Sequence, residues 1–162
     1  MFVLRYLCIL ALVVWLGGML VAGVVVAPSI FGVLQTWNDT QGRVLAGQVF
    51  GEVLQRIYWL GYAMGGVMFV TLTLHRLLGA RPLRYGVRAA ILAIMLGLTL
   101  AADYYVGPQV AAIQADVKGP VSSLAETDPR KIEFDRLHGL ANILLSLTVL
   151  GGLVLLTWEA RE

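Results

Sequence analysis

A stretch of 33 residues from Tyr6 to Asn38 carries no charged side chain, and three more long apolar stretches follow within a chain of 162 residues. The interior of a bilayer offers no water to hydrogen-bond a bare backbone. An apolar stretch of this length must therefore satisfy its own N–H and C=O groups by forming a helix. The sequence thus predicts an all-α protein, a four-span transmembrane helix bundle surrounded by the lipid bilayer.

The composition agrees with residence in a membrane. Hydrophobic residues make up 59% of the chain and charged residues 14%, against about 45–50% and about 25% in soluble domains. The formal net charge of +2 is spread along the chain and gives no basis for a nucleic-acid partner. The length favours a single integral membrane domain over residues 1–162. The first apolar stretch is about twice as long as a signal-peptide core, so we expect a permanent span.

The apolar stretches and the residues between them set the expected spans. Pro28 should kink the first span, because proline removes a helical N–H. Residues 36–42 have the composition of a turn, and Thr40 or Gln41 is placed to cap the next helix. Asp128, followed by a proline, has the features of a helix start. We expect spans over about residues 4–35, 46–78, 85–106 and 130–158.

The charges on the loops predict an orientation. The connection between the second and third spans carries four arginines and no acidic residue: Arg76, Arg81, Arg84 and Arg88. The positive-inside rule places such a short basic connection in the cytoplasm. With four spans, both chain termini of this multi-pass protein are then also cytoplasmic.

Small residues are spaced for close helix packing. Gly47 with Gly51 and Gly61 with Gly65 form two Gly-xxx-Gly pairs, which let helices approach when lipid supplies no hydrophobic drive. Two interpretations stay open. The pairs either pack within the four-helix bundle, or they serve a homo-oligomer or docking into a larger membrane complex.

Six polar side chains fall in the half of the predicted bundle away from the arginine-rich connection: Glu52, Arg56, Asp103, Arg136, His138 and Asn142. Glu52 and Arg56 are spaced i,i+4, in the order that favours an ion pair. His138 and Asn142 share one helix face. Ionisable groups at membrane depth are costly and usually face the bundle interior or a wet cavity. This half of the bundle is therefore the candidate polar pocket.

The cluster has two interpretations. In the first, Asp103 pairs with Arg136 or His138 and holds the third and fourth spans together, while Glu52 pairs with Arg56. In the second, the cluster is a shallow binding or proton-handling pocket, because a histidine beside a carboxylate titrates near neutral pH.

Cofactor and metal sites have little support in the sequence. The two histidines, His75 and His138, fall at opposite membrane faces, which counts against one haem held by both. Ligation of a haem or chlorin by a single histidine stays an alternative. Cys8 is the lone cysteine, so neither a disulfide framework nor a cysteine-based zinc site is expected. We predict a buried structural thiol at Cys8.

Motifs of known enzyme classes are missing from the sequence. It contains no phosphate-binding loop, no Gly-x-Ser-x-Gly and no His-Glu-x-x-His. No catalytic residues are therefore predicted, and enzymatic activity has no support in the sequence.

The start of the fourth span has the sequence DPRKIEFDRLHGLANILL, residues 128–145. Together with YVGPQVAAIQ before it and APSIFGVL in the first third, it resembles the transmembrane-protein-205-like family. The resemblance covers nearly the whole chain and implies a small four-helix membrane protein whose domain has no assigned function. Its most specific motif lies on the polar cluster, which favours Arg136, His138 and Asn142 as a working site.

Two functions are consistent with these features. The first is a small integral membrane protein that binds or moves a small solute, ion or lipid headgroup at a polar pocket near the non-cytoplasmic face. The alternative is an accessory structural subunit of a larger membrane protein complex.

Overall fold

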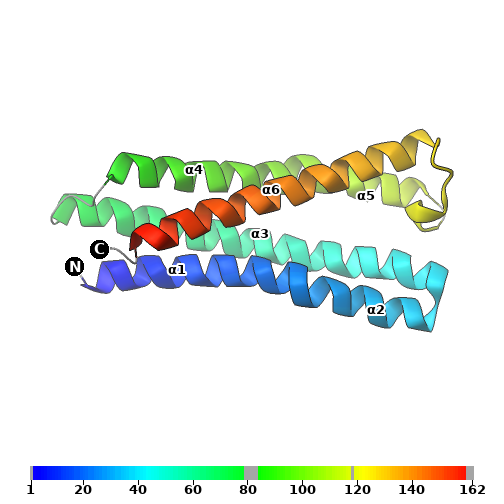
Figure 1. The fold of residues 1–162 in the computed structure, drawn as a ribbon, viewed down its shortest axis with the longest axis horizontal. Helices are drawn as coiled ribbons and strands as arrows, with labels where there is room; N and C mark the ends of the chain where they lie inside the picture. The colour runs from blue at the N-terminus through cyan, green and yellow to red at the C-terminus, as the bar shows by residue number, and fades with distance from the viewer. Residues whose placement is uncertain (1, 79–83, 118, 160–162) are drawn as a thin grey trace.

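Four long helical segments make up the computed structural model of the protein, which describes residues 2–78, 84–117 and 119–159 (Figure 1). The helices are α1 (Phe2–Val21), α2 (Ala27–Trp37), α3 (Asp39–Leu78), α4 (Tyr85–Ala101), α5 (Gly107–Asp116) and α6 (Pro129–Glu159). Single π-helical turns, Ala22–Val26 and Ala102–Val106, join α1 to α2 and α4 to α5. Among the described residues, four continuous helical segments are long and apolar enough to cross a membrane. The predicted all-α, four-span bundle is confirmed.

The start of α1, the end of α3, the start of α4 and the end of α6 lie at one end of the molecule, which we call the termini end (Figure 1). The α2–α3 junction and the segment between α5 and α6 lie at the other end, the loop end. The helices therefore form two antiparallel hairpins. The first contains α1, α2 and α3, and the second contains α4, α5 and α6.

The junction between α2 and α3 is tighter than the expected turn over residues 36–42. Asn38 is the single extended residue between the two helices. Its Oδ1 atom accepts hydrogen bonds from the backbone N–H groups of Thr40 at 3.1 Å and Gln41 at 2.9 Å. Asn38 is therefore the N-cap, and the expectation that Thr40 or Gln41 caps the helix is wrong. An asparagine that satisfies two orphan donors lets α3 begin at once.

The start of α6 follows the prediction. Asp128 Oδ1 accepts from the Arg130 backbone N–H at 2.9 Å, and Pro129 is the first helical residue. The Arg130 side chain also contacts Asp128, and this guanidinium holds the pKa of the Asp128 carboxyl below its usual range. A second contact, from Arg130 to Asp116, ties the start of α6 to the end of α5.

The two hairpins carry an internal repeat with a spacing of 80 residues. Pro28 and Pro108 both follow a π-helical turn, and these turns also lie 80 residues apart. The residue directly after each proline donates a side-chain hydrogen bond to the carbonyl oxygen four residues earlier, Ser29 to Val25 and Gln109 to Tyr105. Identical residues at this spacing include Leu12 and Leu92, Leu16 and Leu96, Gly17 and Gly97, Leu20 and Leu100, Ala22 and Ala102, and Val26 and Val106.

The π-helical turns have a common cause. Proline has no N–H, so the helical ladder loses one bond and its backbone must adjust. An i→i+5 turn before the proline is one such adjustment. The disturbance expected at Pro28 is thus present as a π-helical turn, and the same solution recurs at Pro108.

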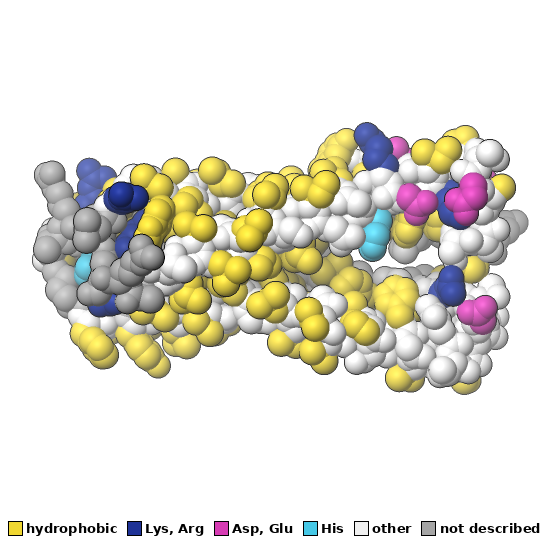
Figure 2. Space-filling view, in the orientation of Figure 1, with side chains coloured by type: hydrophobic (Ala, Val, Ile, Leu, Met, Phe, Trp, Pro, Cys, Tyr) yellow, Lys and Arg dark blue, Asp and Glu magenta, His cyan; other side chains and the backbone are white. Residues whose placement is uncertain are grey.

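The hydrophobic core lies toward the termini end. Its buried residues come from all four spans: Cys8, Ala11, Leu12, Trp15, Leu16, Met19, Met68, Leu92, Met95 and Leu155. By contrast, neither α2 nor α5 has a fully buried residue. Figure 2 shows the consequence, because the surface is hollowed between the two hairpins toward the loop end. The hydrophobic core is therefore concentrated at the termini end, and a hollow separates the two hairpins on one face of the loop end.

The helical segments are longer than a bilayer requires. They contain 36, 40, 32 and 31 residues, about 47 to 60 Å at ~1.5 Å per residue, against a hydrocarbon core of ~30 Å. On α3 the uncharged residues 57–74 span about 27 Å, and the exposed residues Glu52 and Arg56 precede them. Each segment is therefore longer than the hydrocarbon core, and we expect the loop end, which contains Glu52 and Arg56, to extend beyond it.

Candidate functional site

Asp103 is the one predicted pocket residue that the structure buries. It lies in the second π-helical turn and is 8% exposed. Tyr62 on α3 donates its hydroxyl hydrogen to Asp103 Oδ2 at 2.8 Å. This contact joins the two hairpins at the outer limit of the core. One of the two interpretations of the cluster pairs Asp103 with Arg136 or His138, whereas the side chain that contacts Asp103 in the structure is Tyr62.

The remaining predicted residues on α6 are exposed. Arg136 pairs with Glu133 on its own helix, with Nη2 to Oε1 at 2.7 Å and Nε to Oε2 at 2.9 Å. The His138 ring stacks parallel to Phe134, with 6.2 Å between the ring centroids. Asn142 lies on the same exposed side. The i,i+3 carboxylate satisfies Arg136 locally, which explains why it does not reach Asp103.

Glu52 and Arg56 are both exposed on α3. Among the described residues no ion pair joins them, so the expected i,i+4 pair is wrong. An exposed pair of this kind gains at most a few tenths of a kcal/mol (about 0.3–0.5), and fixing two long side chains offsets much of that gain.

Three of the four singled-out glycines pack inside the molecule. A Cβ on Gly61 would lie 2.7 Å from Trp15 Nε1, and one on Gly65 would lie 2.6 Å from Leu96 Cδ2. Gly47 lies against Gln114 of α5, with 3.0 Å from an added Cβ to Nε2. No atom lies within 4 Å of a Cβ placed on Gly51. The close contacts therefore support packing within the bundle at Gly47, Gly61 and Gly65.

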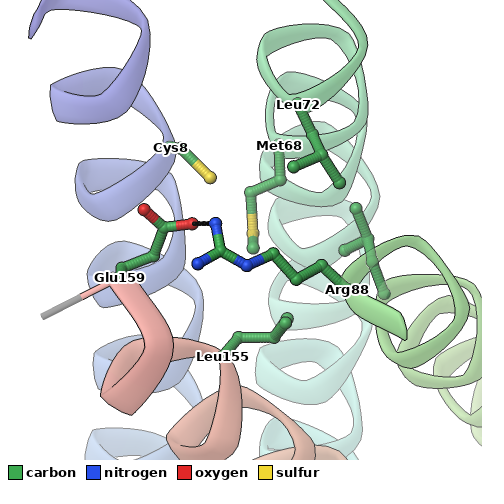
Figure 3. A pocket seen from close by; sticks show the side chains of 7 residues that line it. Cys8, Met68, Leu72, Arg88, Leu155 and Glu159 are labelled. Carbon is green, nitrogen blue, oxygen red and sulfur yellow. Dashed lines mark hydrogen bonds and ion pairs between the residues drawn. The ribbon is translucent and has the colours of Figure 1, made fainter. Parts of the chain in front are cut away.

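A buried ion pair that was not predicted from the sequence lies at the termini end. Arg88 in the first turn of α4 donates from Nη1 to Oε1 of Glu159, the last residue of α6, at 2.9 Å. The two side chains are 5% and 8% exposed. Figure 3 shows them facing each other between Cys8 of α1 and Met68 of α3. Cys8 is buried as predicted.

The helix ends make this pair interdependent. A helix N-terminus carries partial positive charge and a C-terminus partial negative charge. Arg88 and Glu159 each stand at the end that disfavours their own sign. Their mutual contact offsets this cost and also part of the cost of burial.

A periodic signal for this pair was present in the sequence. Arg88 lies one turn before Leu92 and two turns before Met95, so it continues the buried face of α4. Glu159 in the same way follows Leu155 by four residues on α6. The sequence prediction counts Arg88 among the charges of the connection and ends the fourth span at residue 158. Neither Arg88 nor Glu159 is therefore expected in the core.

The histidines and metal ligands give no further site. His75 lies in the last turn of α3 at the termini end, whereas His138 lies near the start of α6 at the loop end. Within the described residues, no group of three or more His, Cys, Asp or Glu side chains is placed to hold a metal ion.

Comparison with known proteins places the chain in a family. No curated protein and no solved structure matches it. Residues 10–118 match the domain of unknown function DUF4149. This range contains Tyr62, Arg88 and Asp103, and it ends before α6 with Arg136, His138 and Glu159. By this match, the chain belongs to the DUF4149 family of domains of unknown function.

Proposed function

We propose that this membrane protein binds a small solute, ion or lipid headgroup at the loop end, with Asp103 as the anchoring group. The observation that carries the proposal is a buried carboxylate in the π-helical turn between α4, which contributes to the core, and α5, which has no fully buried residue. Buried ionisable residues in a membrane protein are costly, and they commonly mark a path or binding site for a ligand.

The chemistry of Asp103 indicates which ligands suit it. An ionised carboxylate has about four lone-pair sites, and Tyr62 is the side-chain donor in contact with it. The remaining acceptor capacity favours a ligand with N–H or O–H donors, or a small cation. Asp103 lies 18 residues after Tyr85, about 27 Å along the helix. That depth is near the far edge of a ~30 Å hydrocarbon core, where a ligand has access from water.

The local backbone supports a binding role. Asp103 stands in a π-helical turn, and such turns are frequent at functional sites. Irregular backbone at membrane depth is tolerated where protein buries it or where it lines a wet cavity. Arg136, His138 and Asn142 form the exposed rim of the proposed site and not its floor.

The orientation and the finer family likeness belong to the same proposal. Arg76 and Arg84 are exposed at the termini end, which favours a cytoplasmic location for that end and for both termini. The ligand then enters from the non-cytoplasmic side. The likeness to the transmembrane-protein-205-like family rests on residues 128–145, which form the start of α6 beside the hollow.

Native mass spectrometry of the protein, extracted gently from its own membrane, tests the proposal. A reproducible extra mass on the wild type should be lost in Asp103→Asn, which keeps the shape of the side chain and removes its charge. Asp135→Asn is the matched control, because it neutralises an exposed aspartate on the same half of the bundle. If Asp103→Asn keeps the mass and only unfolds at a lower temperature, the Asp103–Tyr62 contact is structural.

An accessory role in a larger complex is the second candidate function. Val33 and Trp37 on α2 are 68% and 73% exposed, and Trp37 is the last residue of α2 before the junction at the loop end. Exposed large apolar side chains at this end of the molecule favour a protein partner. The same spectra would then show other polypeptides in fixed stoichiometry. Gly61 and Gly65 are unsuited to such docking, because they face Trp15 and Leu96 inside the chain.

A further inference from the structure

The termini end contains a small pocket built by all four spans. Two adjoining cavities of about 10 and 20 Å³ share Cys8, Leu72, Arg88 and Glu159 among their lining residues. The larger one also reaches Arg5 of α1 and Thr71 and His75 of α3. A cavity of this volume admits about one water-sized atom.

The charges around this pocket are unbalanced. Its lining includes two arginines, Arg5 and Arg88, but Glu159 is the single carboxylate among the described lining residues. His75 adds a further nitrogen donor or acceptor. The pocket as described is therefore rich in hydrogen-bond donors and carries net positive charge.

Arg5 has a donor that the described residues do not satisfy. Its Nη2 atom donates to the backbone oxygen of Glu159. Its Nε atom is buried and has no acceptor among the described residues. A buried N–H without an acceptor is costly, and more so when the donor is charged. An acceptor that enters the cavity relieves this cost.

The position of the pocket agrees with a ligand from the membrane surface. Arg76 and Arg84 are exposed at the same end. Arg76 packs over the Tyr85 ring, with 4.4 Å from its guanidinium carbon to the ring centroid. On α3, His75 directly follows the uncharged residues 57–74. The pocket therefore lies at the level where a bilayer presents its phosphate groups.

We propose that this pocket binds a phosphate group, with one phosphate oxygen inserted toward Arg5 Nε and the rest of the group at the mouth. The shared chemistry is an anionic phosphate oxygen, whether it comes from a lipid headgroup or from free inorganic phosphate. Arg88 and Glu159 position Arg5 through the backbone of Glu159 and keep the cavity polar. This site is distinct from the proposed site at Asp103, at the opposite end of the molecule.

The test uses the full chain in nanodiscs of phosphatidylglycerol or of digalactosyldiacylglycerol, an uncharged lipid without phosphate, with thermal unfolding and native mass spectrometry as readouts. Arg5→Lys keeps the charge and removes the Nε donor at its position. Arg84→Lys is the matched control, since Arg84 is exposed at the same end and does not line the cavity.

We expect retention of phosphatidylglycerol to fall about tenfold in Arg5→Lys, the usual effect of losing one charge-assisted hydrogen bond. Arg84→Lys should retain it like the wild type. Wild-type protein should also unfold at a higher temperature in phosphatidylglycerol than in the phosphate-free galactolipid. Stabilisation by inorganic phosphate in galactolipid nanodiscs would identify free phosphate as a sufficient ligand.

Two outcomes overturn the proposal. Equal retention of phosphatidylglycerol by Arg5→Lys and Arg84→Lys would show that the Arg5 Nε donor does not bind the lipid. An unfolding temperature of the wild type that responds neither to the anionic lipid nor to phosphate would exclude the site, and this reading holds even when Arg5→Lys fails to fold.

Discussion

At the scale of single residues, Gly61 marks a close approach between α1 and α3. Trp15 is buried to 1% exposure in the core, and its indole fills the space beside this glycine. A Cβ added there meets the rigid body of the indole and not the end of a flexible side chain. The absence of a side chain at Gly61 is therefore part of the packing.

Gly61→Ala should lower the free energy of unfolding by about 1–3 kcal/mol, the usual cost of overpacking a core. Thermal unfolding in detergent, followed by circular dichroism, measures the change. Gly51→Ala is the control, because no atom lies within 4 Å of its added Cβ, and it should be neutral or stabilising by up to ~1 kcal/mol. Equal effects of the two substitutions would contradict the packing of Trp15 against Gly61.

The Arg88–Glu159 pair gives a second prediction at this scale. Glu159→Gln leaves a buried guanidinium without its charged partner and should destabilise the fold by about 3–5 kcal/mol. The exchanged pair Arg88→Glu with Glu159→Arg should recover much of that loss, because each charge then suits its helix end. Unfolding temperatures of the three proteins compare these effects.

Glu133→Gln serves as the control for this pair, since it breaks an exposed contact with Arg136, and exposed ion pairs contribute little to stability. A Glu159→Gln protein that is no less stable than Glu133→Gln would mean that the buried pair does not stabilise the fold.

At the scale of elements, the helix starts and the π-helical turns divide the molecule. Asn38 and Asp128 cap the two helices that return from the loop end, α3 and α6. The π-helical turns at Ala22–Val26 and Ala102–Val106 lie at the limit of the hydrophobic core, on the side of the loop end. Their common spacing from a proline shows that one local solution is used in both hairpins.

The cap at Asp128 predicts a pH dependence for the first turn of α6. Because Arg130 lowers the pKa of the folded Asp128 carboxyl, this contribution to stability is present above the unfolded pKa of ~3.9. It is lost as the pH falls through the lower, folded pKa. Hydrogen exchange of the amides of residues 130–132 should accelerate in the wild type only in that acidic range.

Asp128→Ala should show the fast exchange already at neutral pH, because the cap is gone. Asp128→Asn keeps a capping oxygen and should stay protected without the acid dependence. Identical exchange in all three proteins at neutral pH would argue against a capping role for Asp128.

At the scale of the whole molecule, the two hairpins share a core at the termini end, and a hollow separates them on one face toward the loop end (Figures 1 and 2). The helical segments are longer than a hydrocarbon core, so we expect part of the loop end to lie outside it. The two ends also differ in charge, because Glu159 alone among the described carboxylates lies at the termini end. The proposed sites follow this difference, with a carboxylate near the loop end and arginines at the termini end.

Cysteine labelling tests this placement in intact cells. In a Cys8→Ser background, Gly51→Cys should react with a membrane-impermeant maleimide from outside, because Gly51 lies on the loop-end side of Arg56 and outside the uncharged residues 57–74. Gly66→Cys should stay unlabelled, since it lies within residues 57–74. Both glycines are exposed and have open space around an added Cβ, so depth is the main variable. Labelling of Gly51→Cys only in permeabilised cells would reverse the orientation, and labelling of Gly66→Cys would contradict the span.

Much of the fold follows from the sequence, because hydrophobicity and backbone hydrogen bonding act locally. Long apolar stretches without water must be helical, and Asp128 with Pro129 starts a helix wherever the rest of the chain lies. The length of the α2–α3 junction could not be predicted from the sequence. Whether Asn38 or a later residue caps α3 depends on how closely α2 and α3 approach at Gly42, where an added Cβ would clash with Leu34 O.

The sequence by itself determined the lipid surroundings, the all-α class and the four spans, since each depends on the chemistry of consecutive residues. The tertiary structure alone decided which distant groups meet. Asp103 finds Tyr62 and not Arg136, and Arg88 finds Glu159 across the α4–α6 hairpin. The physical reason is that a polar partner is chosen by the rotation and spacing of whole helices, which the packing of Trp15, Gly61 and the rest of the core sets.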